Sequence, residues 1–299
     1  MRNLACAIAF LLFIQHTLNG APPRKIEVGE KPESVCRGFD DKLFVTIIDG
    51  EEPGDGGINV IEGDEVRVFC RGMNSPKGIT YVGGFLVVAD ETTVWKVNAD
   101  GKMTKLATLS DFPEPIEFLN DIVSTPDGKG VYVTEMSHPK WMFDPARERT
   151  LWPLDSPEAK CPNTGCVYQV GLDGTVTQIV PAGGVMTGPN GVAVGTIGNA
   201  ERILLGDFFS GRILAWDGDR HTLITDGLRG ADGVELVGDT IYVSSWSLGK
   251  VWKYDLKRKS LTLISDNFTT AADLFFDQKT RQIIVPDMID GTLTFLPLN

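Results

Sequence analysis

Five carboxylate or amide side chains and one lysine recur at a nearly regular spacing along this chain. They stand in the middle of three-residue signatures, each followed by an apolar segment. The six middle residues are Glu33, Lys77, Asn120, Asn190, Asp232 and Asp273. Oxygen ligands from Asp, Glu and Asn suit a hard cation with a high coordination number, which favours calcium over magnesium and disfavours zinc and copper. Such chemistry requires that distant segments of the chain bring these side chains together.

A repeat of about 42 residues would bring these side chains together. The middle residues follow one another at spacings of 44, 43, 70, 42 and 41 residues. Short runs of β-branched and aromatic residues alternate with Gly, Asp and Asn turns, and the chain after its first twenty residues has no helical stripe. Up to four short strands per unit of this length indicate the blade of a β-propeller.

The sequence therefore predicts an all-β fold, a six-bladed β-propeller with about 42 residues per four-stranded blade. Residues 26–299 are expected to form a single domain, because a blade cannot bury its faces without its neighbours. Since the first strand of each blade lines the central channel, the six middle residues should converge there.

Asp-Gly and Asn-Gly pairs also have an ordinary structural explanation. They form tight hairpin turns, as expected at Asp127-Gly128. Asn190 and Asp232 differ because their pairs precede the first strand of a repeat. On the repeat alone, a polar channel filled with water is as good an interpretation as a metal site.

The step of 70 residues predicts a loop insertion in the third blade, at about residues 137–164, lying over one face of the ring. Trp141, Phe143 and Trp152 either form an apolar wall over the channel or only pack the insertion onto the propeller. His138 is the histidine nearest the predicted mouth, although a lone His in a long polar loop is more often solvated than catalytic.

Residues 1–20 have the layout of a signal peptide. Arg2 precedes an apolar run over residues 4–14 and a small-residue exit, and the run is too short to span a bilayer. We therefore expect a secreted or periplasmic protein with no transmembrane segment in its mature chain.

Four cysteines follow this segment, at Cys36, Cys70, Cys161 and Cys166. Cys161 and Cys166 are predicted to close a small loop as a disulfide, and their spacing fits a zinc site poorly. Cys36 and Cys70 are predicted to be free thiols, because the first and last strands of one blade lie too far apart for a bridge.

The charge balance and the missing motifs narrow the function. The chain has 28 basic and 40 acidic residues, a formal charge of -12, without a long basic cluster. This argues against nucleic acid as a partner. There is no Gly-x-Ser-x-Gly elbow, Gly-rich phosphate loop or zinc signature, which disfavours serine-hydrolase, nucleotide and zinc chemistry.

Four of the signatures, in order, resemble those of the senescence-marker-protein, gluconolactonase and luciferin-regenerating-enzyme family. The likeness extends to the calcium propellers that include paraoxonase and diisopropylfluorophosphatase, and it covers nearly all of the chain after residue 20. The matching motifs are Pro32-Glu33, Phe118-Leu119-Asn120-Asp121, Gly188-Pro189-Asn190-Gly191 and Gly230-Ala231-Asp232-Gly233. The resemblance implies a catalytic Ca²⁺, or another divalent cation, held by Glu33, Asn120, Asn190 and Asp232. It also implies hydrolysis of lactones or phosphotriesters.

Two positions depart from that family. Lys77 stands where paraoxonases carry a His, and Phe118 stands where gluconolactonase-like members carry an Arg that holds a sugar acid. Neither specific substrate is therefore supported. Lys77 would either balance Asp273 or Glu33 within the channel or hold a substrate anion.

The leading hypothesis is a secreted, calcium-dependent, gluconolactonase-like hydrolase of a small-molecule lactone or ester. The metal would polarise the substrate oxygen, and Asp232 would act as nucleophile or base. The candidate channel or substrate contacts are Lys77, Asp273, Phe118 and His138. The alternative is a non-catalytic secreted propeller that binds a small ligand or a protein partner. A lyase similar to strictosidine synthase is weaker, because that relative lacks the metal ligands.

Overall fold

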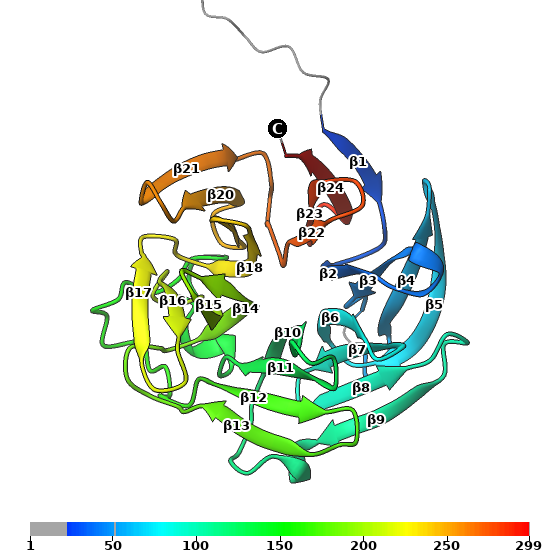
Figure 1. Cartoon of the computed structure of the whole chain (residues 1–299), viewed down its shortest axis with the longest axis horizontal. Helices are drawn as coiled ribbons and strands as arrows, with labels where there is room; N and C mark the ends of the chain where they lie inside the picture. Colours follow the sequence, from blue (N-terminus) through cyan, green and yellow to red (C-terminus); the bar gives the residue numbers. More distant parts are fainter. Residues whose placement is uncertain (1–22, 51, 299) are drawn as a thin grey trace, which may run out of the picture.

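The computed structural model describes residues 23–50 and 52–298. Its strands form six antiparallel four-stranded sheets arranged in a ring around a central channel (Figure 1). The predicted six-bladed β-propeller is confirmed. In the described part of the chain, no helix is long and apolar enough to cross a bilayer. The predicted signal peptide, residues 1–20, lies outside the described residues.

Each blade runs from an inner strand at the channel to an outer strand at the rim. The first two blades contain β2 (Pro32–Arg37), β3 (Leu43–Ile47), β4 (Gly56–Glu62) and β5 (Glu65–Met73), then β6 (Pro76–Val82), β7 (Phe85–Asp90), β8 (Thr93–Val97) and β9 (Met103–Thr108). The next two contain β10 (Leu119–Ser124), β11 (Gly130–Glu135), β12 (Cys166–Gly171) and β13 (Val176–Val180), then β14 (Pro189–Ile197), β15 (Ala200–Asp207), β16 (Ile213–Trp216) and β17 (His221–Thr225). The fifth contains β18 (Ala231–Val237), β19 (Thr240–Ser245), β20 (Lys250–Asp255) and β21 (Ser260–Ser265).

The sixth blade joins the two ends of the described chain. It consists of β22 (Phe275–Asp277), β23 (Gln282–Asp287), β24 (Thr292–Pro297) and, as its outer strand, β1 (Arg24–Glu27). Ile26 of β1 lies opposite Leu293 of β24, so backbone pairing closes the ring. The sequence analysis assigned no strand before Pro32, and its domain start at residue 26 falls inside β1.

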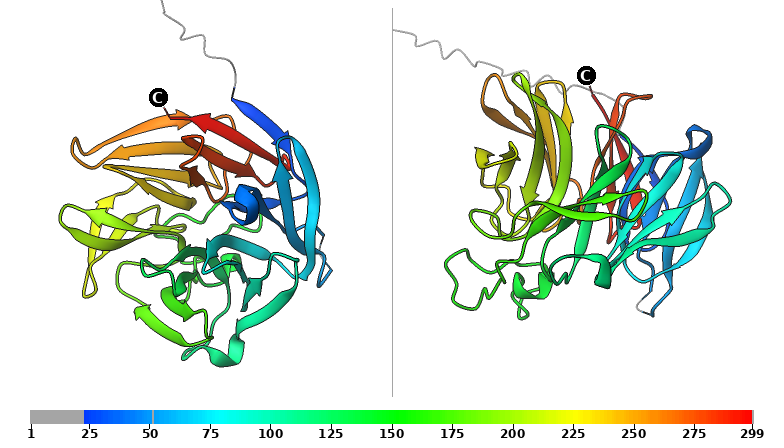
Figure 2. Two further views of the ribbon diagram at one scale, coloured as in Figure 1. Left: turned by 45° about the vertical axis from the view of Figure 1, so that its right-hand side comes forward. Right: turned by 60° about the horizontal axis from the view of Figure 1, so that its bottom comes forward.

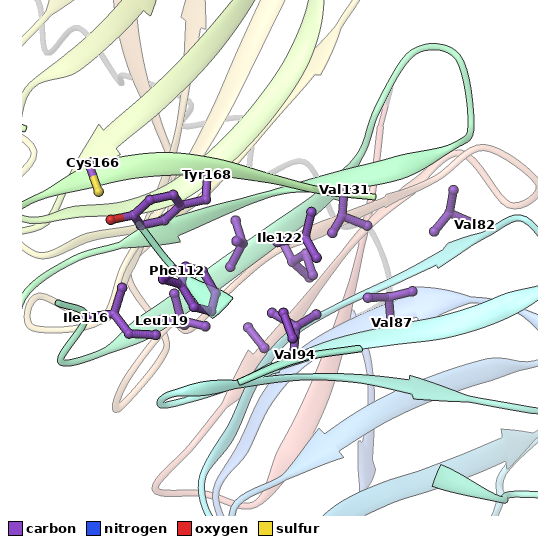
Figure 3. Close-up of a cluster of buried hydrophobic side chains, with 14 residues drawn as sticks. Val82, Val87, Val94, Phe112, Ile116, Leu119, Ile122, Val131, Cys166 and Tyr168 are labelled. Atoms are coloured by element: carbon purple, nitrogen blue, oxygen red, sulfur yellow. The ribbon is translucent and has the colours of Figure 1, made fainter. Parts of the chain in front are cut away.

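Apolar clusters between neighbouring sheets hold the blades together. Figure 3 shows the cluster between the second and third blades, where Val87 and Val94 face Ile122 and Val131. A comparable cluster fills each of the other five interfaces between blades. The sheets stand around the channel with their connecting loops gathered at the two ends (Figure 2). Sheets packed face to face in this way confine polar groups to the channel and the outer surface.

The segment between β11 and β12, residues 136–165, is the predicted insertion. It contains a single turn of 3-10 helix, η3 (Pro139–Trp141). A seventh apolar cluster joins Phe143 and Trp152 of this segment to Phe208 and Trp246 on the fourth and fifth blades. The insertion thus packs on the propeller at one end of the channel.

The predicted disulfide between Cys161 and Cys166 is wrong, because all four cysteines of the described residues are free. Cys166 is buried inside the third blade, where its thiol lies beside the hydroxyl of Tyr168 (Figure 3). The thiol of Cys161 instead donates to the carbonyl oxygen of Trp141 at 3.5 Å.

Cys36 and Cys70 are free thiols, as predicted. They lie on β2 and β5, the first and last strands of one blade.

Removal of β1 should destabilise the whole ring, because it exposes the edge of β24 and uncovers the cluster against which Ile26 packs. We expect a variant that begins at Val28 to lose at least about 3 kcal/mol in the free energy of unfolding. Denaturant titration against a control that begins at Pro23 measures the difference. Equal stability of the two variants would contradict this account of ring closure.

Candidate functional site

Five of the six predicted channel residues line one cavity of about 210 Å³. They are Glu33, Lys77, Asn120, Asn190 and Asp232. Each belongs to the inner strand of a different blade, from β2 to β18 (Figure 1). All five side chains are buried. Segments far apart in sequence thus bring these five polar side chains together. We call the five residues the floor of the cavity.

A one-residue irregularity in each of these inner strands sets the direction of the polar side chain. In the fourth blade Pro189 pairs with Asp207, but Val192 pairs with Leu205, so the inner strand carries one extra residue. The same shift occurs at the signatures of the other four blades. A β-bulge of this kind redirects a side chain out of the regular alternation of the strand.

Carboxylates at the ends of the second strands hold the segments that lead into these bulges. The carboxylate of Asp207 accepts hydrogen bonds from the backbone N–H groups of Thr187, at 2.5 Å, and Gly188, at 3.1 Å. Asp90, Glu135 and Asp287 accept backbone N–H bonds at the corresponding places in their own blades. We call these four side chains the strand-end carboxylates.

Gly191 and Gly233 follow two of the polar residues because neighbouring inner strands approach closely there. A Cβ atom on Gly191 would lie 2.0 Å from the carbonyl oxygen of Asp232. A Cβ atom on Gly233 would lie 2.2 Å from the backbone nitrogen of Leu274. The Asn-Gly and Asp-Gly pairs are therefore packing features inside inner strands, and the hairpin-turn interpretation does not apply to them.

Asp273 does not line this cavity. Ala271 bridges Asp287 just as Pro189 pairs with Asp207, so the position equivalent to Asn190 in the sixth blade is Ala272. Asp273 lies one residue further along, where it accepts a hydrogen bond from Ser34. It lines a second cavity, of about 200 Å³, together with Asp121 and Glu235.

Four oxygen atoms on the floor of the first cavity have no hydrogen-bond partner. They are Glu33 Oε2, Asn120 Oδ1, Asn190 Oδ1 and Asp232 Oδ1. Only three other buried side-chain atoms among the described residues are in this state, on Ser210, His221 and Thr292. Buried polar atoms are normally paired. Two carboxylates and two amides with free oxygens match the donor set that a hard divalent cation prefers.

One contact on the floor agrees with this donor set. The amide nitrogen of Asn120 lies 2.8 Å from the sulfur of Met136, which leaves its oxygen on the cavity side. Within the described residues, no three His, Cys, Asp or Glu side chains are grouped so that they could hold a metal ion. A cation on this floor would therefore depend on the amide oxygens as well as the carboxylates.

Burial makes the two carboxylates of the floor hard to ionise. It raises the pKa of Glu33 to about 7, and the nearby ammonium of Lys77 only partly opposes this. Burial, and then the charge of Glu33, raises the pKa of Asp232 well above its usual range. Two like charges in a dry site repel each other strongly unless a cation compensates them.

Lys77 is buried on the same floor, with 8% of its surface exposed. Burial lowers the pKa of its ammonium, and the charges of Glu33 and Asp232 oppose that shift. Among the described residues, however, no carboxylate forms an ion pair with Lys77, and its nitrogen lies 5.3 Å from the ring centroid of Phe118. The ammonium acts on Glu33 from a distance and does not balance Asp273 by contact.

Apolar side chains make the wall of the cavity. Phe143 meets both Phe208 and Trp246 edge to face, with ring centroids 5.8 Å and 5.7 Å apart, respectively. Phe118, Met136, Pro139 and Met288 complete the wall. Phe143 is the only one of the three predicted aromatic residues of the insertion to reach the cavity, since Trp141 and Trp152 do not line it.

His138 lies behind this wall. Its Nδ1 accepts a hydrogen bond from the backbone of Lys140 at 3.1 Å, and its ring lies 5.4 Å from that of Phe118. Burial, together with the charge of Lys140, lowers its pKa. His138 therefore supports Phe118 and is not one of the residues lining the cavity.

The sequence analysis missed four wall residues that share one position in the repeat. Met136, Phe208, Trp246 and Met288 each directly follow the last residue of the second strand of a blade. These positions could have been recognised in the sequence. Each is a large apolar residue that directly follows a strand ending in Asp, Glu or Ser.

Comparison with known proteins supports the fold alone. No family model matches the chain, and no curated protein matches it. A chain in the crystal structure of a nidogen/laminin complex is similar, with a TM-score of 0.59 and 16% sequence identity. The match covers 78% of this chain and 79% of that one.

The raised pKa of Glu33 predicts a pH dependence in cation-free protein. Between its ordinary pKa of 4.5 and about 7, the folded protein keeps a proton that the unfolded chain releases, so stability falls as the pH rises through this window. We expect Glu33→Gln to remove this loss and to raise the free energy of unfolding at about pH 8 by about 3 kcal/mol. Urea titration in chelator at about pH 5 and about pH 8 measures it.

The exposed Glu65 provides the control, since Glu65→Gln removes the same charge where no burial opposes it. A Glu33→Gln variant that is no more stable than wild type at about pH 8 would contradict the assigned burial of charge.

Proposed function

We propose that this protein is a calcium-dependent hydrolase of lactones or related esters. The observation that supports this best is the set of four unpaired oxygens on Glu33, Asn120, Asn190 and Asp232, which face one cavity. The resemblance to the calcium propellers selects the same four residues. Residues 1–20 have the layout of a signal peptide, so we further propose that the enzyme acts outside the cytoplasm.

The residues fit the cation by charge as well as by ligand type. Glu33 and Asp232 together carry two negative charges, which a divalent cation would neutralise, and Asn120 and Asn190 add neutral oxygens. When bound, such a cation polarises a carbonyl or phosphoryl oxygen. The burial that raises the pKa of both carboxyl groups in its absence is the physical reason for the site to take up a positive charge.

Asp232 would carry the proton or bond-forming step. It is buried at the start of β18, and its Oδ1 is free of hydrogen bonds. A carboxylate in this position can accept a proton from an attacking water, or attack the acyl carbon itself and form an acyl-enzyme that water then hydrolyses. The apolar wall of Phe143, Phe208 and Trp246 would exclude bulk water from the reacting group.

A second candidate is a non-catalytic propeller that binds a protein partner. The similar solved chain belongs to a complex between nidogen and laminin, which gives this alternative some support. A protein that binds partners at its rim has no need of four unpaired oxygens buried in its channel. We therefore favour the hydrolase.

Glu33 and Glu235 provide a matched test of the cation site. Burial raises the pKa of each to about 7, but Glu235 lies at the second cavity and accepts a hydrogen bond from the backbone of Phe276 at 3.0 Å. We expect calcium to raise the melting temperature of wild type and Glu235→Ala, and to have little effect on Glu33→Ala, which removes the ligand oxygen. Thermal unfolding with calcium and with chelator measures this. Equal calcium responses in all three proteins would exclude Glu33 as a ligand.

Asp232→Asn keeps an oxygen of the same size but removes the charge needed by a base or nucleophile. We expect the turnover of the best substrate in a panel of lactones and esters to fall by at least about a hundredfold, while bound calcium is largely retained. Initial rates and metal analysis on the same samples make the measurement. Full activity in this variant would exclude the role given to Asp232.

A further inference from the structure

The buried ammonium of Lys77 has no task in the function proposed so far. Burial lowers the pKa of this ammonium, and four acidic groups, Glu33, Asp232, Glu91 and Asp90, oppose the shift, but none forms an ion pair with it. Asp90 is engaged elsewhere, because its carboxylate accepts hydrogen bonds from the backbone of Asn74 and Ser75 and from the indole of Trp95. Lys77 thus faces the cavity with its hydrogen-bonding capacity unused.

The charges of the floor residues determine which kind of ligand would pair with Lys77. If all three groups are ionised, Glu33, Asp232 and Lys77 sum to one negative charge. With the divalent cation of the proposed function, on which this step rests, the two carboxylates are neutralised and the floor carries one positive charge in excess. Since charge is costly in a buried site unless it is paired, a ligand with one negative charge is the natural complement.

The wall residues determine the chemistry of the uncharged part of the ligand. Phe143, Phe208 and Trp246 offer no free hydrogen-bonding group, because the indole nitrogen of Trp246 lies 2.9 Å from the sulfur of Met288. A polyhydroxylated ligand would leave its hydroxyl groups unpaired against this wall, which disfavours binding. An alkyl or aryl body would instead bury apolar surface.

We propose that Lys77 makes this cavity a binding site for carboxylic acids with an apolar body. The carboxylate lies at the end occupied by Lys77, and the body lies against Phe143, Phe208 and Trp246. Hydrolysis of a lactone or ester produces a carboxylate, so the acid bound in this way is the product of an apolar substrate. The wall therefore selects apolar acyl groups over sugar acids, and Lys77 retains the product.

Calorimetric binding of hexanoate, hexanamide and gluconate to the calcium-loaded protein tests this directly. Hexanoate should bind wild type at least about tenfold more tightly than either of the other two. In Lys77→Met, the advantage of hexanoate over hexanamide should fall to about threefold or less, while hexanamide affinity stays within about twofold of wild type. Lys140→Met is the matched control, since Lys140 is exposed, lies 4.9 Å from the ring of Trp141 and does not line the cavity.

The outcomes separate this proposal from the hydrolase itself. Calcium titration of each protein is performed first, and Lys77→Gln replaces Lys77→Met if the latter does not fold. A wild type that binds calcium but does not prefer hexanoate, or a Lys77 variant that keeps the full preference, overturns the role of Lys77 and leaves the hydrolase standing. A wild type that binds no calcium overturns the proposed function. Tighter binding of gluconate than of hexanoate overturns the assignment of the wall.

Discussion

In four of the six blades, hydrogen bonds from backbone N–H groups to the strand-end carboxylates control the geometry of the channel. Asp90, Glu135, Asp207 and Asp287 each hold the segment that leads into the inner strand of the same blade. In three of these blades a bulge follows at once and redirects the next side chain into the channel. Lys77, Asn120 and Asn190 are therefore placed by this backbone restraint. Glu33 and Asp232 lie in the first and fifth blades, whose second strands do not end in a carboxylate.

The apolar clusters between blades provide the stability that this floor lacks. An unpaired buried polar atom costs about 1–3 kcal/mol, and the floor contains four. Six clusters of buried side chains, one at each interface between blades, offset this cost at a distance from the channel. Stability and the proposed binding are thus assigned to different layers of each sheet, so that a cation bound as proposed would pair the four oxygens without disturbing the clusters between blades.

The repeat period was sufficient to predict six blades and the polar residues of five of them, because strand spacing and blade size are local properties of the chain. In the sixth blade, the repeat period pointed to Asp273, whereas Ala272 occupies the equivalent position. The register there depends on a bridge between Ala271 and Asp287 that no local pattern shows. The closing strand β1 and the free thiols of Cys161 and Cys166 were missed for the same reason. Each depends on a partner or a side-chain direction that only the assembled ring determines.

The sixth blade breaks the symmetry of the floor, and this gives the cavity a direction. Ala272 brings no oxygen to the position that its counterparts fill with polar groups, whereas the fourth to sixth blades supply Phe208, Trp246 and Met288 to the wall. Lys77 belongs to the second blade. A ring of six identical blades would present the same contacts to a ligand from every side, which suits only a symmetric ligand such as an ion. With an ammonium in one blade and an apolar wall from four others, the same ring would orient an asymmetric ligand across the proposed cation.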